Sequence, residues 1–147
     1  MTTTQTATAV RPRPNPGELS LRRLHLMRAG YLLMGLGLVI VKWPLLAGAY
    51  TMPVYEGVVT AMLVAMSLFA LLGLRYPARM LPVLLFESAW KLIWLAAVAL
   101  PRFLTGELDA TTQEVLASCS LIVVILLVTP WRFAWRQYVR SGGDPWR

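Results

Sequence analysis

The chain has 147 residues, of which 57% are hydrophobic, and a formal net charge of +7 at pH 7. A soluble domain of this length keeps a largely polar surface, so the high apolar fraction, gathered in long uncharged runs, indicates a lipid environment. The basic residues lie between and beyond these runs, beside the expected membrane, and this placement argues against nucleic acid as a partner.

The first 28 residues are expected to lie on the cytoplasmic side of the membrane. Residues 1–17 combine a Thr-rich stretch with alternating Arg and Pro, a composition that predicts a disordered tail. In residues 18–28, apolar residues recur at helical spacing among arginines. This pattern predicts an amphipathic segment that lies on the inner leaflet or extends the first span.

Four apolar runs predict an all-α protein, a four-helix transmembrane bundle within residues 29–131. The expected spans are about 29–47, 57–74, 80–100 and 115–131, each close to the length of about 20 residues that crosses a hydrocarbon core. Residues 132–147 follow as a basic tail with interspersed aromatic residues.

The distribution of basic residues predicts the orientation of these spans, because cytoplasmic flanks carry an excess of Lys and Arg. One side of the bundle would carry eleven arginines, and the other only Lys42 and Arg102 together with four acidic residues. Both termini are therefore predicted to be cytoplasmic. The eleven are Arg11, Arg13, Arg22, Arg23, Arg28, Arg75, Arg79, Arg132, Arg136, Arg140 and Arg147.

The expected partner of this basic side is the bilayer itself, through its anionic lipid head groups. Arg dominates over Lys in a chain rich in Ala, Leu and Gly, which is typical of a bacterial protein and places the bundle in the bacterial inner membrane. The residues predicted to contact lipid at the inner leaflet are Arg22, Arg23, Arg28, Arg75, Arg79, Arg132 and Arg136.

The third run holds two opposite charges, Glu87 and Lys91. They are four residues apart, so both project from one helix face, with Glu on the favourable N-terminal side. Trp94 shares that stripe and Trp90 borders it. Two central charges cost about 5 to 7 kcal/mol on insertion scales, and the apolar residues of the run return about 3 to 6. The span is therefore expected to depend on pairing and on its neighbours.

Two interpretations of this charged pair are open. The pair could be a proton or ion relay, or a polar contact for a substrate or a quinone head group, since ionisable residues in spans usually face a bundle interior. Alternatively it is a mutually neutralised pair that fixes the orientation of the helix. The second is preferred because further titratable partners are few, although Lys42 and Glu56 could form a second charged layer near the outer boundary, where snorkelling is their expected role.

The sequence predicts no catalytic residue, no metal site and no cofactor. A single cysteine, Cys119, and a single histidine, His25, exclude an intrachain disulfide, a CxxC pair and a bis-histidine haem site within one subunit. Small residues at Gly30, Gly35 and Gly37 would let helices approach closely, either within the bundle or in a homo-oligomer or larger membrane complex.

Several short motifs lie in and around the third span and near the C-terminus: residues 73–77, 80–82, 84–87, 90–94, 100–101, 130–131 and 144–147. Through them the chain resembles a family of small four-span bacterial membrane proteins of uncharacterised activity. The resemblance covers residues 28–147 and supports the topology.

A second resemblance, to the DoxX-like proteins, is carried by residues 28–30, Gly35, residues 56–57 and residues 72–75. These are also small four-span bundles, and some relatives are linked to quinone-associated electron transfer. Glu87 and Lys91 are not among the marks of that family.

The leading functional interpretation is a non-enzymatic accessory or structural subunit of the membrane, because no nucleophile with a base, no metal cluster and no phosphate loop is present. The first alternative is a small transporter or proton-conducting element built on Glu87 and Lys91. The second is a DoxX-like redox subunit that contacts quinone.

Overall fold

The computed structural model describes residues 19–142 of the chain. The expected N-terminal tail and the last five residues lie outside the described residues, as do Arg11, Arg13 and Arg147. The described part is helical apart from short connections and contains no strand. Four helical stretches are long and apolar enough to cross a membrane, as in a multi-pass membrane protein: Leu21–Leu46, Val54–Arg75, Leu81–Thr105 and Ala110–Val128. The predicted all-α architecture with four long apolar helices is thus confirmed.

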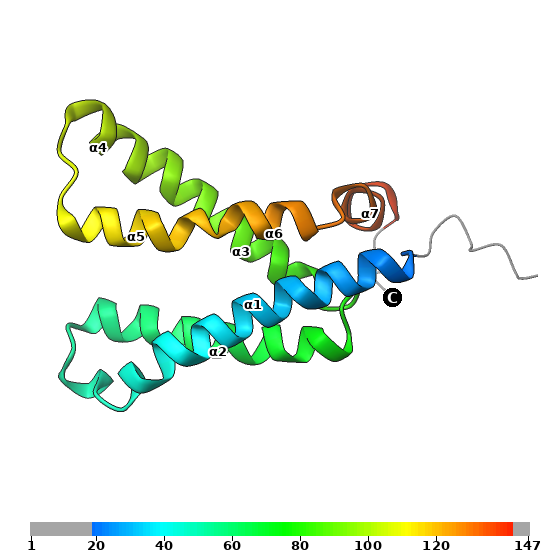
Figure 1. Ribbon diagram of the computed structural model, residues 1–147, viewed down its shortest axis with the longest axis horizontal. Helices are drawn as coiled ribbons and strands as arrows, with labels where there is room; N and C mark the ends of the chain where they lie inside the picture. Colours follow the sequence, from blue (N-terminus) through cyan, green and yellow to red (C-terminus); the bar gives the residue numbers. More distant parts are fainter. Residues whose placement is uncertain (1–18, 143–147) are drawn as a thin grey trace, which may run out of the picture.

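The first two long helices form an antiparallel hairpin (Figure 1). Helix α1 (Leu21–Leu46) starts after Ser20, whose side chain accepts a hydrogen bond from the Arg23 amide and caps the helix. The amphipathic segment is therefore the first two turns of α1. A 3-10 turn, η1 (Ala49–Thr51), leads into α2 (Val54–Arg75).

The third long stretch is made of α3 (Leu81–Trp94), a π-helical turn η2 (Leu95–Ala99) and α4 (Leu100–Thr105). Pro101 explains the wide turn, because proline has no amide hydrogen and its ring would clash with the carbonyl four residues earlier. In η2 the Leu100 amide donates to the carbonyl of Leu95, five residues earlier, and not to the carbonyl four residues earlier as in an α-helix. The stretch ends at Gly106, whose φ of 76° lies in the left-handed region that favours glycine.

The fourth stretch, α5 (Ala110–Ser120) followed by α6 (Ile122–Val128), ends earlier than the expected bound of 131. Thr129 is extended, and Pro130 cannot donate the next helical hydrogen bond. The chain then turns into α7 (Trp131–Trp135) and a π-helical turn η3 (Arg136–Arg140). Figure 1 shows α7 almost end-on while the long helices run across the view, so α7 lies across one end of the bundle.

The third and fourth stretches pack side by side as a second hairpin, through α3 with α6 and η2 with α5. This hairpin packs on the first one through α1 with α6 and α2 with α3. The buried core gathers near the end of the bundle where α1 begins and α2 ends, and it includes a residue of α7. The α2–α3 connection lies at the same end (Figure 1). The core residues are Met27, Tyr31, Met34, Met66, Ala70, Leu81, Leu84, Ile125 and Ala134.

Three of the glycines in the first two helices differ in what surrounds them. A Cβ at Gly30 would lie 2.6 Å from Val128 Cγ2 in α6, and a Cβ at Gly73 would lie 2.6 Å from the ring of Tyr31. A Cβ at Gly37 would meet nothing within 4 Å. Gly30 and Gly73 therefore serve close packing within the chain, whereas Gly37 does not.

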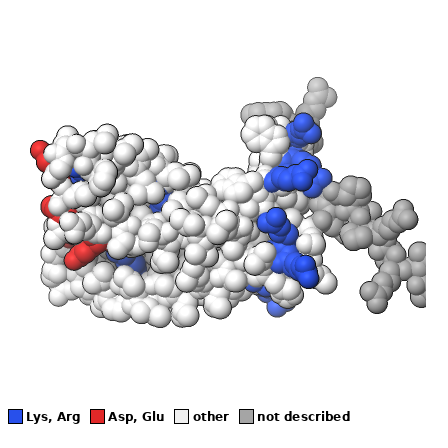
Figure 2. Space-filling view, turned by 45° about the horizontal axis from the view of Figure 1, so that its top comes forward, with Lys and Arg blue, Asp and Glu red and all other residues white. Residues whose placement is uncertain are grey.

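Most of the charged side chains visible in Figure 2 lie toward the two ends of the molecule. Most of the visible Lys and Arg cluster at the end where α1 begins and α7 lies, hereafter the basic end. The visible Asp and Glu gather at the opposite end, the acidic end, where some basic side chains also lie, among them Arg102. The predicted lipid-contacting arginines belong to the helix ends and connections at the basic end: Arg22, Arg23, Arg28, Arg75, Arg79, Arg132 and Arg136.

Candidate functional site

The charged pair of the third long helix is an ion pair inside the bundle. Lys91 Nζ lies 2.8 Å from Glu87 Oε1. Glu87 is 3% exposed and Lys91 is 9% exposed. The helix Leu81–Thr105 has 25 residues, and a rise of 1.5 Å per residue puts Lys91 about 15 Å from its start. This depth is close to the middle of an apolar layer about 30 Å thick.

A third side chain completes the pair. Trp90 Nε1 donates a hydrogen bond of 2.7 Å to Glu87 Oε2, so the two carboxylate oxygens have different partners. The ammonium of Lys91 also lies over the Trp90 ring, 5.6 Å from its centroid, within cation–π range. Trp90 was expected only to border the charged stripe. The three-residue spacing from Glu87 was the signal for this contact, because residues three apart are neighbours on a helix.

The polar groups around the pair also have hydrogen-bond partners. Ser88, next to Glu87 and buried, donates 2.8 Å to the carbonyl of Leu84. Among the described residues, no buried side-chain nitrogen or oxygen lacks a hydrogen-bond partner. Cys119 of α5 is fully buried, and its thiol is within electrostatic range of both charges. The arrangement neutralises the pair and leaves none of its polar atoms unpartnered.

Within residues 19–142, no hydrogen bond or ion pair joins the other residues expected at this site to Glu87 or Lys91. Trp94 is half-buried. Lys42 is half-buried and Glu56 is exposed, and within residues 19–142 neither of them forms an ion pair. Trp43 donates a hydrogen bond of 3.1 Å from its indole Nε1 to Ser67 Oγ and so links α1 to α2.

The described residues contain no group of three or more His, Cys, Asp or Glu side chains that could hold a metal ion. His25 is exposed on the first turns of α1, and Cys119 is buried.

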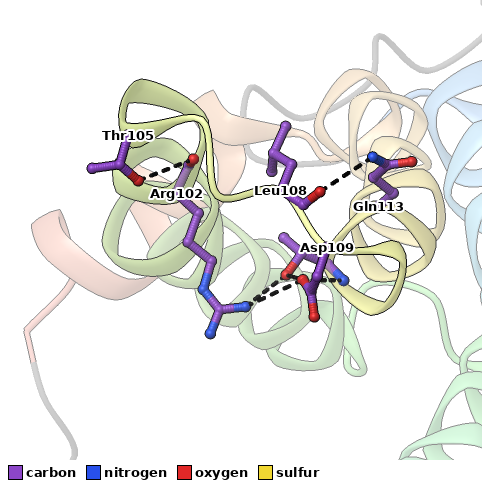
Figure 3. A network of polar contacts seen from close by, with 6 residues as sticks. Arg102, Thr105, Leu108, Asp109 and Gln113 are labelled. Carbon is purple, nitrogen blue, oxygen red and sulfur yellow. Dashed lines mark hydrogen bonds and ion pairs between the residues drawn. The ribbon is translucent and has the colours of Figure 1, made fainter.

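A polar network closes the connection between α4 and α5 at the acidic end (Figure 3). Arg102 donates 2.6 Å to the Thr112 hydroxyl and lies 3.5 Å from Asp109 Oδ1. The Thr112 hydroxyl and amide both donate to that same carboxylate oxygen, so Asp109 caps α5. Hydrogen bonds from the Thr112 side chain and amide, with a smaller contribution from Arg102, lower the pKa of Asp109. The spacing of these residues along the chain did not predict this network.

At the basic end, side chains of α1 donate hydrogen bonds to carbonyls at the end of α2 and in the α2–α3 connection. Arg28 Nε donates 3.1 Å to the carbonyl of Leu74, and the Tyr31 hydroxyl donates 3.0 Å to the carbonyl of Pro77. Arg75 and Arg79 flank the ring of Tyr76 at 5.6 and 5.8 Å from its centroid. Arg28 thus gives one of the last carbonyls of α2 a hydrogen-bond partner, and Tyr31 binds the connection that follows the helix.

Comparisons with protein-family models, with curated proteins and with solved structures found no match to this chain. The two resemblances described above therefore stay predictions.

Proposed function

We propose that the chain is a multi-pass protein of the bacterial inner membrane with both termini in the cytoplasm, and that it acts as a non-enzymatic accessory or structural subunit. The observation that carries the proposal is the state of its intramembrane charges. Glu87 and Lys91 neutralise each other, and Trp90 occupies the remaining carboxylate oxygen. A group that relays protons needs a further titratable or water-accessible partner. An ion pair whose two charges offset each other suits a helix whose orientation must be fixed.

The cavities at the surface agree with a structural role for the pair. One cavity of about 890 Å³, open to the surface, lies at the basic end, and a second open cavity of about 390 Å³ lies between α2 and α3. Neither is lined by Glu87 or Lys91.

A liposome assay separates the accessory role from a proton relay. Purified protein in liposomes with an imposed pH gradient should give no proton flux above that of empty liposomes, because within residues 19–142 Glu87 and Lys91 form an ion pair with each other and with no other charged side chain. The double variant Glu87→Leu/Lys91→Leu should behave in the same way. Glu56→Gln is a matched control, since it removes an exposed carboxylate outside the pair. Flux that disappears in the folded double variant but persists in Glu56→Gln would establish the relay instead.

The proposed orientation rests on the charge separation between the two ends, since the positive-inside bias puts the basic end in the cytoplasm (Figure 2). Single cysteines test it in a Cys119→Ala background. An impermeant thiol reagent added to intact cells should label Glu107→Cys at the acidic end and should leave Arg79→Cys and Ser141→Cys unlabelled. All three positions are exposed in the structure, so protection reports the membrane and not burial. Labelling of Ser141→Cys in intact cells would overturn the cytoplasmic assignment.

A further inference from the structure

The cavity of about 890 Å³ at the basic end lies between α3 and the segment formed by α7 and η3. Leu85 of α3 forms its apolar wall, and the other side chains come from α7 and η3. Those that bear on its chemistry are Arg132, Arg136, Arg140, Trp135 and Tyr138. The cavity therefore joins an apolar wall to a concentration of guanidinium groups and aromatic rings.

The segment that forms the cavity is held in place by three contacts. The Trp131 indole donates 2.8 Å to the Leu126 carbonyl at the end of α6, where the helix leaves carbonyls without partners. Ala134 belongs to the buried core, and Phe133 packs against that core. These contacts fix the α7 segment across the end of the bundle (Figure 1). The backbone that carries its arginines is therefore fixed relative to α3 and α6.

The basic residues that line the cavity suit an anionic ligand. Arg132, Arg136 and Arg140 follow one another at intervals of four, so they run along one side of the helical segment. Within the described part of the chain, Arg132 and Arg140 form no ion pair. Guanidinium groups bind phosphate oxygens through paired N–H donors. The guanidinium groups favour a phosphate as the ligand. The apolar side chain of Leu85 beside them favours a phosphate that is attached to hydrocarbon chains.

The two aromatic residues fit the same ligand. Trp135 is 59% exposed and Tyr138 is 47% exposed, and Trp and Tyr favour the level of the head groups, where one edge is apolar and the other wet. The Tyr138 phenol is a neutral hydrogen-bond donor at pH 7, as an ordinary tyrosine is. Both side chains therefore suit contact with the glycerol region of a lipid.

We propose that this cavity binds the phosphodiester head group of one anionic glycerophospholipid. Arg132 and Arg140 contact the phosphate, Trp135 and Tyr138 contact the glycerol region, and Leu85 contacts the first carbons of the acyl chains. The inference rests on the proposed function in one respect, namely that the basic end lies at a membrane surface. It goes beyond a general attraction of basic residues to the inner leaflet, because it assigns one lipid to one cavity.

The test compares two pairs of arginines that change the net charge equally. Full-length protein in a neutral detergent is titrated with phosphatidylglycerol, and bound lipid is counted by native mass spectrometry. Arg132→Gln/Arg140→Gln should weaken binding of the tightest lipid about tenfold or more, as loss of charged hydrogen bonds does. Arg22→Gln/Arg23→Gln is the matched control, because both residues are exposed at the basic end outside the cavity. The control should bind this tightest lipid as the unmodified protein does. Arg22 and Arg23, as general contacts of the inner leaflet, should affect only the weaker lipids that bind after it.

Two further ligands identify what the cavity recognises. Phosphatidylcholine, which is zwitterionic, and glycerol 3-phosphate, which has no acyl chains, should each bind much more weakly than phosphatidylglycerol. Trp135→Ala should also weaken phosphatidylglycerol binding while leaving all arginines in place. Equal losses in the two arginine variants, no loss in either, or equal binding of glycerol 3-phosphate would overturn the assignment.

Failure of this inference is distinguishable from failure of the proposed function. Lipid binding in detergent does not depend on which way the protein faces in the cell. Cysteine labelling of exposed positions in intact cells reports that orientation directly. Melting curves of the arginine variants, compared with the unmodified protein, show that any loss of lipid occurs in folded protein.

Discussion

Replacing Glu87 and Lys91 together by leucine is expected to destabilise the protein less than either single replacement. Glu87→Leu leaves an ammonium group in an apolar layer, and Lys91→Leu leaves a carboxylate that must take up a proton or draw in water. Removal of one partner of a buried ion pair typically costs about 3 to 5 kcal/mol, whereas exchange of the whole pair for apolar residues is often neutral. The burial of both residues and the 2.8 Å contact place them in this class.

Trp90 adds a refinement to that expectation. Its indole donates to Glu87 Oε2, so both Glu87→Leu and the double variant leave this donor without an acceptor. An unsatisfied buried donor costs about 1 to 3 kcal/mol, and Trp90 is only half-buried, so the lower part of that range applies. Adding Trp90→Phe to the double variant removes the donor and should recover most of this loss.

Unfolding in mixed detergent micelles, with helix content as the signal, gives the free energies of the four members of the double-mutant cycle. The coupling between Glu87 and Lys91 is the difference between the double variant and the sum of the single variants. A strongly favourable coupling is expected. If the two single losses simply add, the residues do not stabilise each other in the membrane, and another partner, such as Lys42 for Glu87, becomes the better hypothesis.

The main features of the fold are visible in the sequence because they depend on the composition of single segments. Runs of apolar residues of spanning length predict four long helices, and four-residue spacing puts Glu87 and Lys91 on one face. Both inferences use distances along one helix. They need no knowledge of how the helices pack.

The helix ends differ from the expected span bounds because an apolar run is not the same object as a helix. Helix α1 begins at Leu21, eight residues before the first expected span, since charged residues can continue a helix beyond the apolar layer. Arg28 stays in the helix with its guanidinium on the carbonyl of Leu74. At the other end of the chain, Pro130 ends the fourth stretch at Val128 despite the apolar sequence.

The contacts between different helices could not be predicted from the sequence. The cavity at the basic end requires α7 to turn across the bundle and meet Leu85 of α3. The network at the acidic end requires Arg102 and Thr112 to face each other across a connection. Many other pairings were compatible with the same residues, and only the packing of the helices selects among them.

Gly73→Ala is expected to destabilise the bundle although alanine is the better helix former. A Cβ at this position would lie 2.6 Å from two atoms of the Tyr31 ring and 2.7 Å from a third. The ring cannot move aside easily, because Tyr31 is fully buried and its hydroxyl donates to the carbonyl of Pro77. Overpacking of this kind typically costs about 1 to 3 kcal/mol. The loss should be seen as a lower melting temperature in detergent.

Gly37→Ala is the matched control, since it makes the same chemical change in α1 where a Cβ would meet nothing within 4 Å. It should be neutral or stabilising by up to about 1 kcal/mol, the usual gain of alanine over glycine within a helix. In a Tyr31→Leu background, the smaller side chain leaves room for the new methyl group, so Gly73→Ala should lose most of its effect. Equal destabilisation by Gly37→Ala and Gly73→Ala would contradict this account, because the damage would then come from glycine loss in general and not from the contact between Gly73 and Tyr31.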